Sequence, residues 1–241
     1  MACYEVGGNH PRVHPSAYVH PLASLIGRVE VGPDCFIAPF ASLRGDFGSI
    51  RVGAGVNVQD CCTVHGAPDG EVVLEDDAHL GHGCIIHNAL VGRNVLVGMN
   101  AVVLDGVVLG EGCVVGSGCV VPSGVAVPAG KLIVGVPGKI VGDVKPGLAA
   151  FKRVGTCWYQ HLAARTRETL VEVSLEECHA GEAGGPWKPW IEAELDALAE
   201  ELGWRGLPWL GGSSIDKDIG KDQADRPRHQ AGRTEQGESE A

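Results

Sequence analysis

The stretch LVGRNVLVGMNAVVLDGVVLGEGCVVGSGCVVPSGVAVPAGKLI, residues 90–133, carries an aliphatic residue at every sixth position. A period of six matches neither a helix, which repeats about every 3.6 residues, nor a simple alternating strand. It is typical of short strands joined by tight corners, where glycine often supplies the backbone angles that a corner requires. Three such turns form one coil of about 18 residues, and stacked coils make a parallel β-helix.

The same period extends back towards the N-terminus with one turn a residue short, between Ile86 and Val91, and with two longer breaks. Three extra residues follow the turn at Leu43, and a loop covers roughly residues 66–73. We therefore predict an all-β solenoid, a parallel β-helix of hexapeptide repeats, over residues 12–141. The predicted inward-facing positions are Val13, Val19, Leu25, Val31, Ile37, Leu43, Val52, Val58, Val64, Leu74, Leu80, Ile86, Val91, Val97, Val103, Leu109, Val115, Val121, Val127 and Ile133.

Beyond the repeat the composition of the chain changes. Pro146 can open a helix, and Thr156 is a candidate N-cap for a helix that continues to about Val171. We predict a C-terminal α-helical segment over residues 142–178. Residues 179–241 hold a Trp-containing extension and then a polar, glycine-rich tail, which we expect to be disordered.

Charge and composition exclude several classes of protein. Acidic residues outnumber basic ones by 30 to 19, which gives a formal net charge of −11 and argues against general nucleic-acid binding. The start of the sequence, MACYEVGGNHP, lacks the features of a signal peptide, and no apolar run is long enough to span a membrane. With nine cysteines and no secretion signal, a reduced cytoplasmic protein is predicted. Five cysteines follow inward positions by four residues and are predicted to be small core residues: Cys35, Cys62, Cys84, Cys113 and Cys119.

Counting along the coils places three side chains one above another. Arg44, His65 and His87 each follow an inward residue of the same face on three successive coils. Neighbouring coils are about 4.8 Å apart, so the two imidazoles lie side by side and can share one metal ion. His79 stays ambiguous, and the remaining histidines outside this region are interpreted as ordinary surface residues.

A third histidine lies on another face of the predicted solenoid. His82 stacks over Asp60, with Gln59 beside it. Its position is poor for completing the site within one chain, so we predict that a neighbouring chain supplies it and that the protein is a homotrimer. Three imidazoles leave Zn²⁺ one open position, as in catalytic zinc sites, although Fe²⁺ or Co²⁺ would also accept such ligands.

Three motifs now connect the chain to a known family. They are ASLRGDFGSIRVGAGVNVQDCCTVHG at residues 41–66, HLGHGCIIH at residues 79–87 and LVGMNAVVLDG at residues 96–106. The chain resembles the γ-class carbonic anhydrase-like hexapeptide-repeat family, within the branch of the phenylacetic-acid-degradation thioesterase and the carnitine-operon protein. The resemblance covers about residues 13–175 and implies that the β-helix is left-handed.

The resemblance also implies roles for individual residues. His65 and His87 would bind the metal from one subunit and His82 from the next, while Gln59 would orient metal-bound water. Asn100 would line the substrate pocket. An intersubunit ion-pair network would be formed by Arg44, Asp46 and Asp60. In some members of this family a long acidic loop between the first two ligands carries a proton-shuttling carboxylate, whereas the corresponding segment here, residues 66–81, is short.

Four functions are compatible with these observations. The leading hypothesis is a metal-dependent hydrolase, an acyl-CoA thioesterase of aromatic-acid (phenylacetate-type) catabolism, in which metal-bound hydroxide attacks a small-molecule thioester. The same site could hydrate CO₂, as γ-class carbonic anhydrases do. A hexapeptide acyltransferase with a histidine base and no metal is a third possibility, and a non-catalytic trimeric scaffold is a fourth. The stacked histidine pair together with Gln59 favours a metal.

Overall fold

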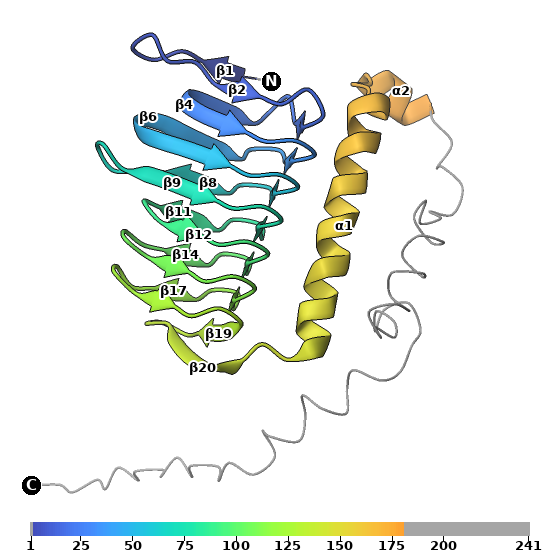
Figure 1. The fold of residues 1–241 in the computed structure, drawn as a ribbon. Coiled ribbons are helices and arrows are strands. Elements are labelled where there is room, and N and C mark those ends of the chain that lie inside the picture. Colours follow the sequence, from blue (N-terminus) through green and yellow to red (C-terminus); the bar gives the residue numbers. More distant parts are fainter. Residues whose placement is uncertain (1, 181–241) are drawn as a thin grey trace, which may run out of the picture. The chain divides into compact units, whose positions relative to one another are not determined.

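The computed structural model describes residues 2–180, and the predictions for the Trp-containing extension and the polar tail lie outside this range apart from its first residues. The described chain is a parallel β-solenoid followed by a C-terminal helix, so the predicted fold class is confirmed (Figure 1). Among the described residues, no helix combines the length and the apolar character that a membrane span requires.

Short strands form two sheets along the solenoid. The 12-stranded sheet contains β1 (Ala2–Tyr4), β2 (Arg12–Val13), β4 (Ser24–Val31), β6 (Ser42–Val52), β8 (Thr63–His65), β9 (Glu71–Leu74), β11 (Ile85–His87), β12 (Leu90–Val91), β14 (Val102–Val103), β15 (Val108–Leu109), β17 (Val120–Val121) and β18 (Ala126–Val127). The 8-stranded sheet contains β3 (Tyr18–Val19), β5 (Phe36–Ile37), β7 (Asn57–Val58), β10 (His79–Leu80), β13 (Leu96–Val97), β16 (Val114–Val115), β19 (Lys131–Val134) and β20 (Lys139–Asp143).

The long strand β6 explains the first break in the period. Its first residues pair with β8 and its last residues pair with β9, so one strand crosses the corner between two faces. The extra residues after Leu43 keep the backbone extended around this corner instead of turning it. Two of the three predicted faces therefore belong to one sheet. At the N-terminus, strand β1 pairs with β4, and the hexapeptide pattern does not predict this strand.

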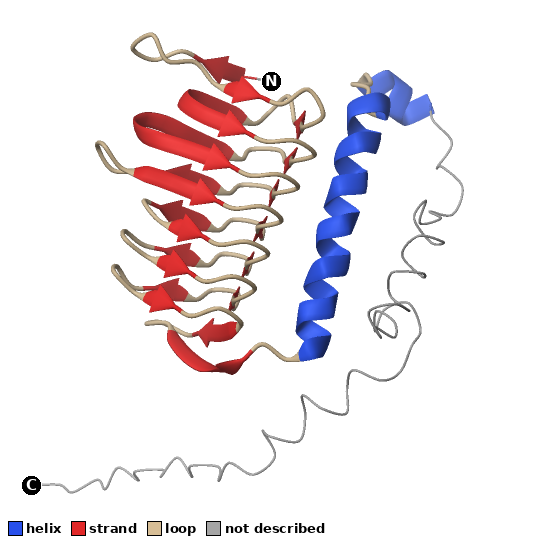
Figure 2. Ribbon diagram, viewed as in Figure 1, coloured by secondary structure: helices blue, strands red, loops and turns tan. Residues whose placement is uncertain are grey.

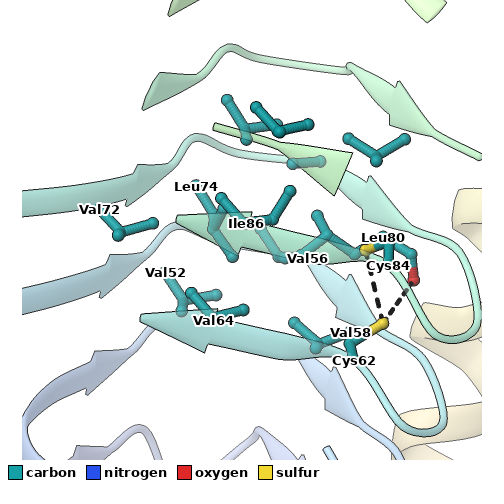
Figure 3. Close-up of a cluster of buried hydrophobic side chains, with 14 of the residues drawn as sticks. Val52, Val56, Val58, Cys62, Val64, Val72, Leu74, Leu80, Cys84 and Ile86 are labelled. Carbon is teal, nitrogen blue, oxygen red and sulfur yellow. Dashed lines mark hydrogen bonds between the residues drawn. The ribbon is translucent and has the colours of Figure 1, made fainter. Parts of the chain in front are cut away.

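The predicted inward residues form the core of the solenoid. All are buried except Val13 and Val19, which are partly buried at its N-terminal end. The five predicted core cysteines are also buried, and burial raises the pKa of Cys35 and of Cys113 to about 12. Cys62 and Cys84 lie on adjacent coils with their sulfur atoms 3.6 Å apart (Figure 3).

Helix α1 (Pro146–Thr169) lies along the 8-stranded sheet, and the short helix α2 (Leu175–Ala180) follows it (Figure 2). The prediction that Thr156 caps a helix is wrong. Because Pro146 already occupies the first turn, Thr156 lies in the helix interior, where its buried hydroxyl donates to the carbonyl of Lys152.

Two kinds of contact hold α1 against the solenoid. Tyr18 stacks on Phe36, and Phe36 contacts Tyr159 of the helix with ring centroids 5.4 Å apart. The buried Lys152 donates to the carbonyl of Asp77 and to the side chain of Asn94. The helix therefore covers the face that carries β3, β5, β7 and β10.

Candidate metal centre

His65 and His87 lie at the ends of adjacent strands β8 and β11, in register with each other and with Arg44 of β6. This is the predicted stack. The Nδ1 atom of His65 and the Nε2 atom of His87 face each other at 3.3 Å. Two ring nitrogens bound to one tetrahedral zinc ion, each at 2.0–2.1 Å, are separated by about the same distance.

A carboxylate holds the opposite nitrogen of each ring. Asp46 Oδ1 lies 3.2 Å from His65 Nε2, and Asp105 Oδ1 lies 3.0 Å from His87 Nδ1. When both imidazoles are neutral and each carboxylate accepts a ring N–H, the two nitrogens that face each other carry lone pairs. Facing lone pairs repel unless a cation lies between them. Carboxylate-bound histidines of this kind are typical of metal sites, so these residues fit a divalent ion.

Further contacts fix the Asp46 side of the pair. Arg44 Nη1 donates to Asp46 Oδ2 at 2.7 Å. Burial raises the pKa of Asp46, but hydrogen bonds from Arg44 and His65 outweigh burial and leave the pKa below its usual value. Phe47 tilts against His65 with ring centroids 5.8 Å apart. The carboxylate is thus ionised at neutral pH and well placed to orient His65.

His82 occupies a different part of the solenoid. It follows β10 of the 8-stranded sheet, and its Nδ1 lies 2.8 Å from Asp60 Oδ2. Among residues 2–180 no hydrogen-bond partner of its Nε2 is found, so this nitrogen could bind a metal ion. Within residues 2–180, no three His, Cys, Asp or Glu side chains of one chain are grouped so as to hold a metal. That His82 completes the site from a neighbouring chain therefore stays a prediction, as does the pairing of Arg44 with Asp60 between chains.

Gln59 and Asn100 belong to the His82 side. Gln59 is almost fully buried, and its Oε1 accepts the backbone N–H of His82 at 3.2 Å. Its Nε2 lies 3.0 Å from Asn57 Oδ1 and 2.6 Å from His79 Nε2. The N–H of Asn100 donates to the His82 carbonyl at 2.9 Å, and its side chain lies over Gly83, where a Cβ would collide with it.

The predicted residues thus form two groups in one chain. Arg44, Asp46, His65 and His87 lie together, and Gln59, Asp60, His82 and Asn100 lie together. The sequence analysis missed Asp105, although it stands two residues after the inward Val103 on the coil next to His87. It also left the role of His79 open.

Burial governs the protonation of His79. Burial, with a smaller contribution from the positive charges of Lys152 and His82, lowers its pKa to about 3. The imidazole is therefore neutral at physiological pH, and its Nε2 can accept a hydrogen bond.

Comparison with known proteins identifies the family. A family model described as bacterial transferase hexapeptide (six repeats) matches residues 88–123. The carnitine operon protein CaiE of Proteus sp. (strain LE138) is 42% identical over 174 residues, which cover 72% of this chain and 88% of that protein. The chain belongs to the CaiE-like hexapeptide-repeat family. The predicted resemblance to the carnitine-operon branch is thereby confirmed.

Solved structures agree with this CaiE-like fold. A hexapeptide transferase family protein from Anaplasma phagocytophilum is 31% identical with a TM-score of 0.65, over 67% of this chain and 96% of that chain. The product of the BC4754 gene of Bacillus cereus is 30% identical with a TM-score of 0.68, over 69% and 96% of the two chains. Many members of the hexapeptide-repeat family are acyltransferases, so membership leaves the reaction of this CaiE-like chain to be argued from its site.

Proposed function

We propose that the protein is a metal-dependent hydrolase of small-molecule thioesters, with acyl-CoA esters of aromatic acids as the substrate class. The observation that carries the proposal is the pair of facing nitrogens of His65 and His87, each ring held by a carboxylate. A divalent metal ion between the two facing nitrogens fits this arrangement, because both rings can then offer it a lone pair. We further propose that the protein acts as a homotrimer in the cytoplasm.

Each residue of the site has a defined task in this proposal. His65 and His87 would hold the ion from one chain, and His82, oriented by Asp60, would hold it from the next. Zn²⁺ is the proposed metal, with Fe²⁺ or Co²⁺ as alternatives. When bound, the ion lowers the pKa of water to about 7 and polarises a carbonyl oxygen.

Residues near His82 would position the reactants. Both hydrogens of the Gln59 amide are engaged inside the chain, which leaves a lone pair of Oε1 to accept a hydrogen bond from the attacking water. Asn100, on the same corner, would line the substrate pocket. Arg44 and Asp46 would keep the ring of His65 fixed while the substrate changes.

Two observations weigh against the other reactions. A transferase that uses one histidine as a base gains nothing from two imidazoles aimed at each other. Fast CO₂ hydration requires a carboxylate free to export protons, but Asp76 and Asp77, between His65 and His82, are engaged in other contacts. Asp76 pairs with Arg93 at 2.9 Å, and Asp77 accepts from Gln160 at 2.9 Å. Both observations favour hydrolysis of a thioester.

The test begins with the full-length purified protein. Elemental analysis should find one divalent ion per chain, and mass photometry should find a trimer. The protein should hydrolyse aryl-acyl-CoA thioesters faster than it hydrates CO₂ or transfers the acyl group to an amine. A metal-free active protein, or a protein that only transfers acyl groups, would refute the proposal.

Two variants separate holding the metal from positioning water. His87→Ala should lose both the metal and the activity, because two remaining imidazoles bind zinc weakly. Gln59→Ala should keep the metal and lose about 10²-fold in kcat. His14→Ala, which removes a surface imidazole bonded to Ser16, is the matched control and should match the wild type.

A further inference from the structure

His79 lies in a row of stacked side chains beneath helix α1, most of them aromatic or aliphatic. It lies on β10 in register with Leu96 on one side and Asn57 on the other, and Phe36 continues the same row. Helix α1 covers this row, and Tyr159 meets the His79 ring edge-on at 5.4 Å. A leucine or phenylalanine side chain would fill this space as well as the imidazole does.

Placing an imidazole there has a cost. The Nδ1 atom of His79 is buried and has no hydrogen-bond partner within the described part of the chain. A buried polar atom without a partner destabilises a protein. Packing alone therefore does not account for the histidine, and the use of the ring has to be sought at its other nitrogen.

That other nitrogen, Nε2, faces the Gln59 amide, whose orientation follows from its contacts. The backbone N–H of His82 can only donate, so the Gln59 atom that faces it at 3.2 Å is the oxygen. The amide nitrogen then points to Asn57 Oδ1 and His79 Nε2, which both accept. Without the acceptor at His79, one amide hydrogen would be buried and unpaired, and only the contacts with Asn57 and the His82 N–H would hold the side chain.

We propose that His79 is a positioning residue that fixes the Gln59 amide with its oxygen towards the catalytic water. The inference rests on the proposed function for the part that concerns water, but the contact itself belongs to the chain without metal. His79 does not touch the substrate or the ion in this arrangement. It acts through Gln59, and α1 acts through His79 by keeping the ring in place.

The experiment uses two substitutions of His79 in the full-length protein. In His79→Leu the space under α1 stays filled, but the acceptor is lost. In His79→Gln the amide oxygen can take the place of Nε2 and accept from Gln59. Tyr18→Phe is the control, because it removes a buried hydroxyl without a partner from the same aromatic cluster under α1.

The first measurement needs neither metal nor activity. In metal-free protein labelled with ¹⁵N at glutamine side chains, the Gln59 amide hydrogens should exchange slowly with solvent in the wild type and in Tyr18→Phe. They should exchange much faster in His79→Leu, and His79→Gln should restore the protection. Unchanged protection in His79→Leu, with its fold and melting temperature preserved, would overturn the proposal.

The second measurement separates this proposal from the proposed function. Loss of a residue that orients a catalytic group commonly costs about 10–100-fold. His79→Leu should lose that much in kcat for thioester hydrolysis at unchanged metal content and KM, with partial rescue in His79→Gln. If Gln59→Ala is inactive while His79→Leu is fully active, the positioning role is refuted and the hydrolase survives. If the wild type hydrolyses no thioester, the hydrolase is refuted and the exchange rates still decide the role of His79.

Discussion

Replacing the two carboxylates behind the histidine pair should weaken metal binding to different extents. In Asp105→Asn and Asp46→Asn the new amide oxygen can still accept the imidazole N–H, but the negative charge is lost. Removal of such partners costs about 10–100-fold in metal affinity. Exposure decides between the two ends of this range, because solvent already screens an exposed charge.

The structure orders the two variants. In a single chain the side chains of Asp105 and His87 are 48% and 34% exposed, whereas those of Asp46 and His65 are 21% and 12% exposed. We therefore expect a loss of about 10-fold, or about 1.4 kcal/mol, for Asp105→Asn and of about 100-fold, or about 2.7 kcal/mol, for Asp46→Asn.

Zinc affinity should be measured by competition between the metal-free protein and a chromophoric chelator of known affinity. Asp143→Asn is the control, because that carboxylate is exposed, pairs with Lys131 and has no contact with a histidine. It should bind zinc like the wild type. Unchanged affinity in both aspartate variants, or a larger loss for Asp105→Asn, would show that these carboxylates do not orient metal ligands as argued.

Three further outcomes are expected. Removing the metal by chelation should lower the melting temperature and release monomers, because the proposed ligands come from two chains; an unchanged melting temperature after verified removal would contradict the intersubunit site. The pKa of His79 is lowered to about 3 in the folded chain, whereas an unfolded histidine titrates near pH 6.5. Between these two values the unfolded chain binds one proton more than the folded chain. The free energy of unfolding should therefore fall as the pH falls from about 6.5 to about 3, by up to about 1.4 kcal/mol per pH unit. Urea denaturation of His79→Leu across this window should show a flatter dependence than the wild type. Lys152→Met leaves the carbonyl of Asp77 and the side chain of Asn94 without their donor. The free energy of unfolding, measured by urea denaturation, should fall by about 3 kcal/mol. A loss below about 1 kcal/mol would mean that water replaces the lysine as donor.

Much of the solenoid is predictable because each coil repeats one physical demand. A small or aliphatic side chain must fill the interior at fixed intervals, so spacing alone predicts that Val91 and Ile133 are buried. The same counting places His65 beside His87, because register between coils follows from the period. The first residue of the helix was harder to predict, since Pro146 and Thr156 can both begin a helix. Only the packing of α1 against the solenoid distinguishes the two positions.

The side-chain contacts of the site could not be read from spacing. Asp105 meets His87 because its side chain turns back across one coil, and a period of six fixes the backbone but not this rotation. The surroundings of the contact between His79 and Gln59 include Tyr159 of α1, a segment far away in the sequence. Residues that depend on a distant element for their environment are therefore the ones that sequence reasoning left open.

The buried cysteines offer a way to follow how the solenoid opens. They lie at different heights along the stack, from Cys35 on the early coils to Cys113 and Cys119 on the late ones. The pKa of about 12 for Cys35 and Cys113 keeps these thiols protonated and unreactive until their coil opens. In a solenoid each coil contacts only its neighbours, so opening can begin at an end and spread. The order in which a thiol reagent labels these residues under native conditions would show whether the stack frays from its first coils, from its last coils or as one cooperative unit.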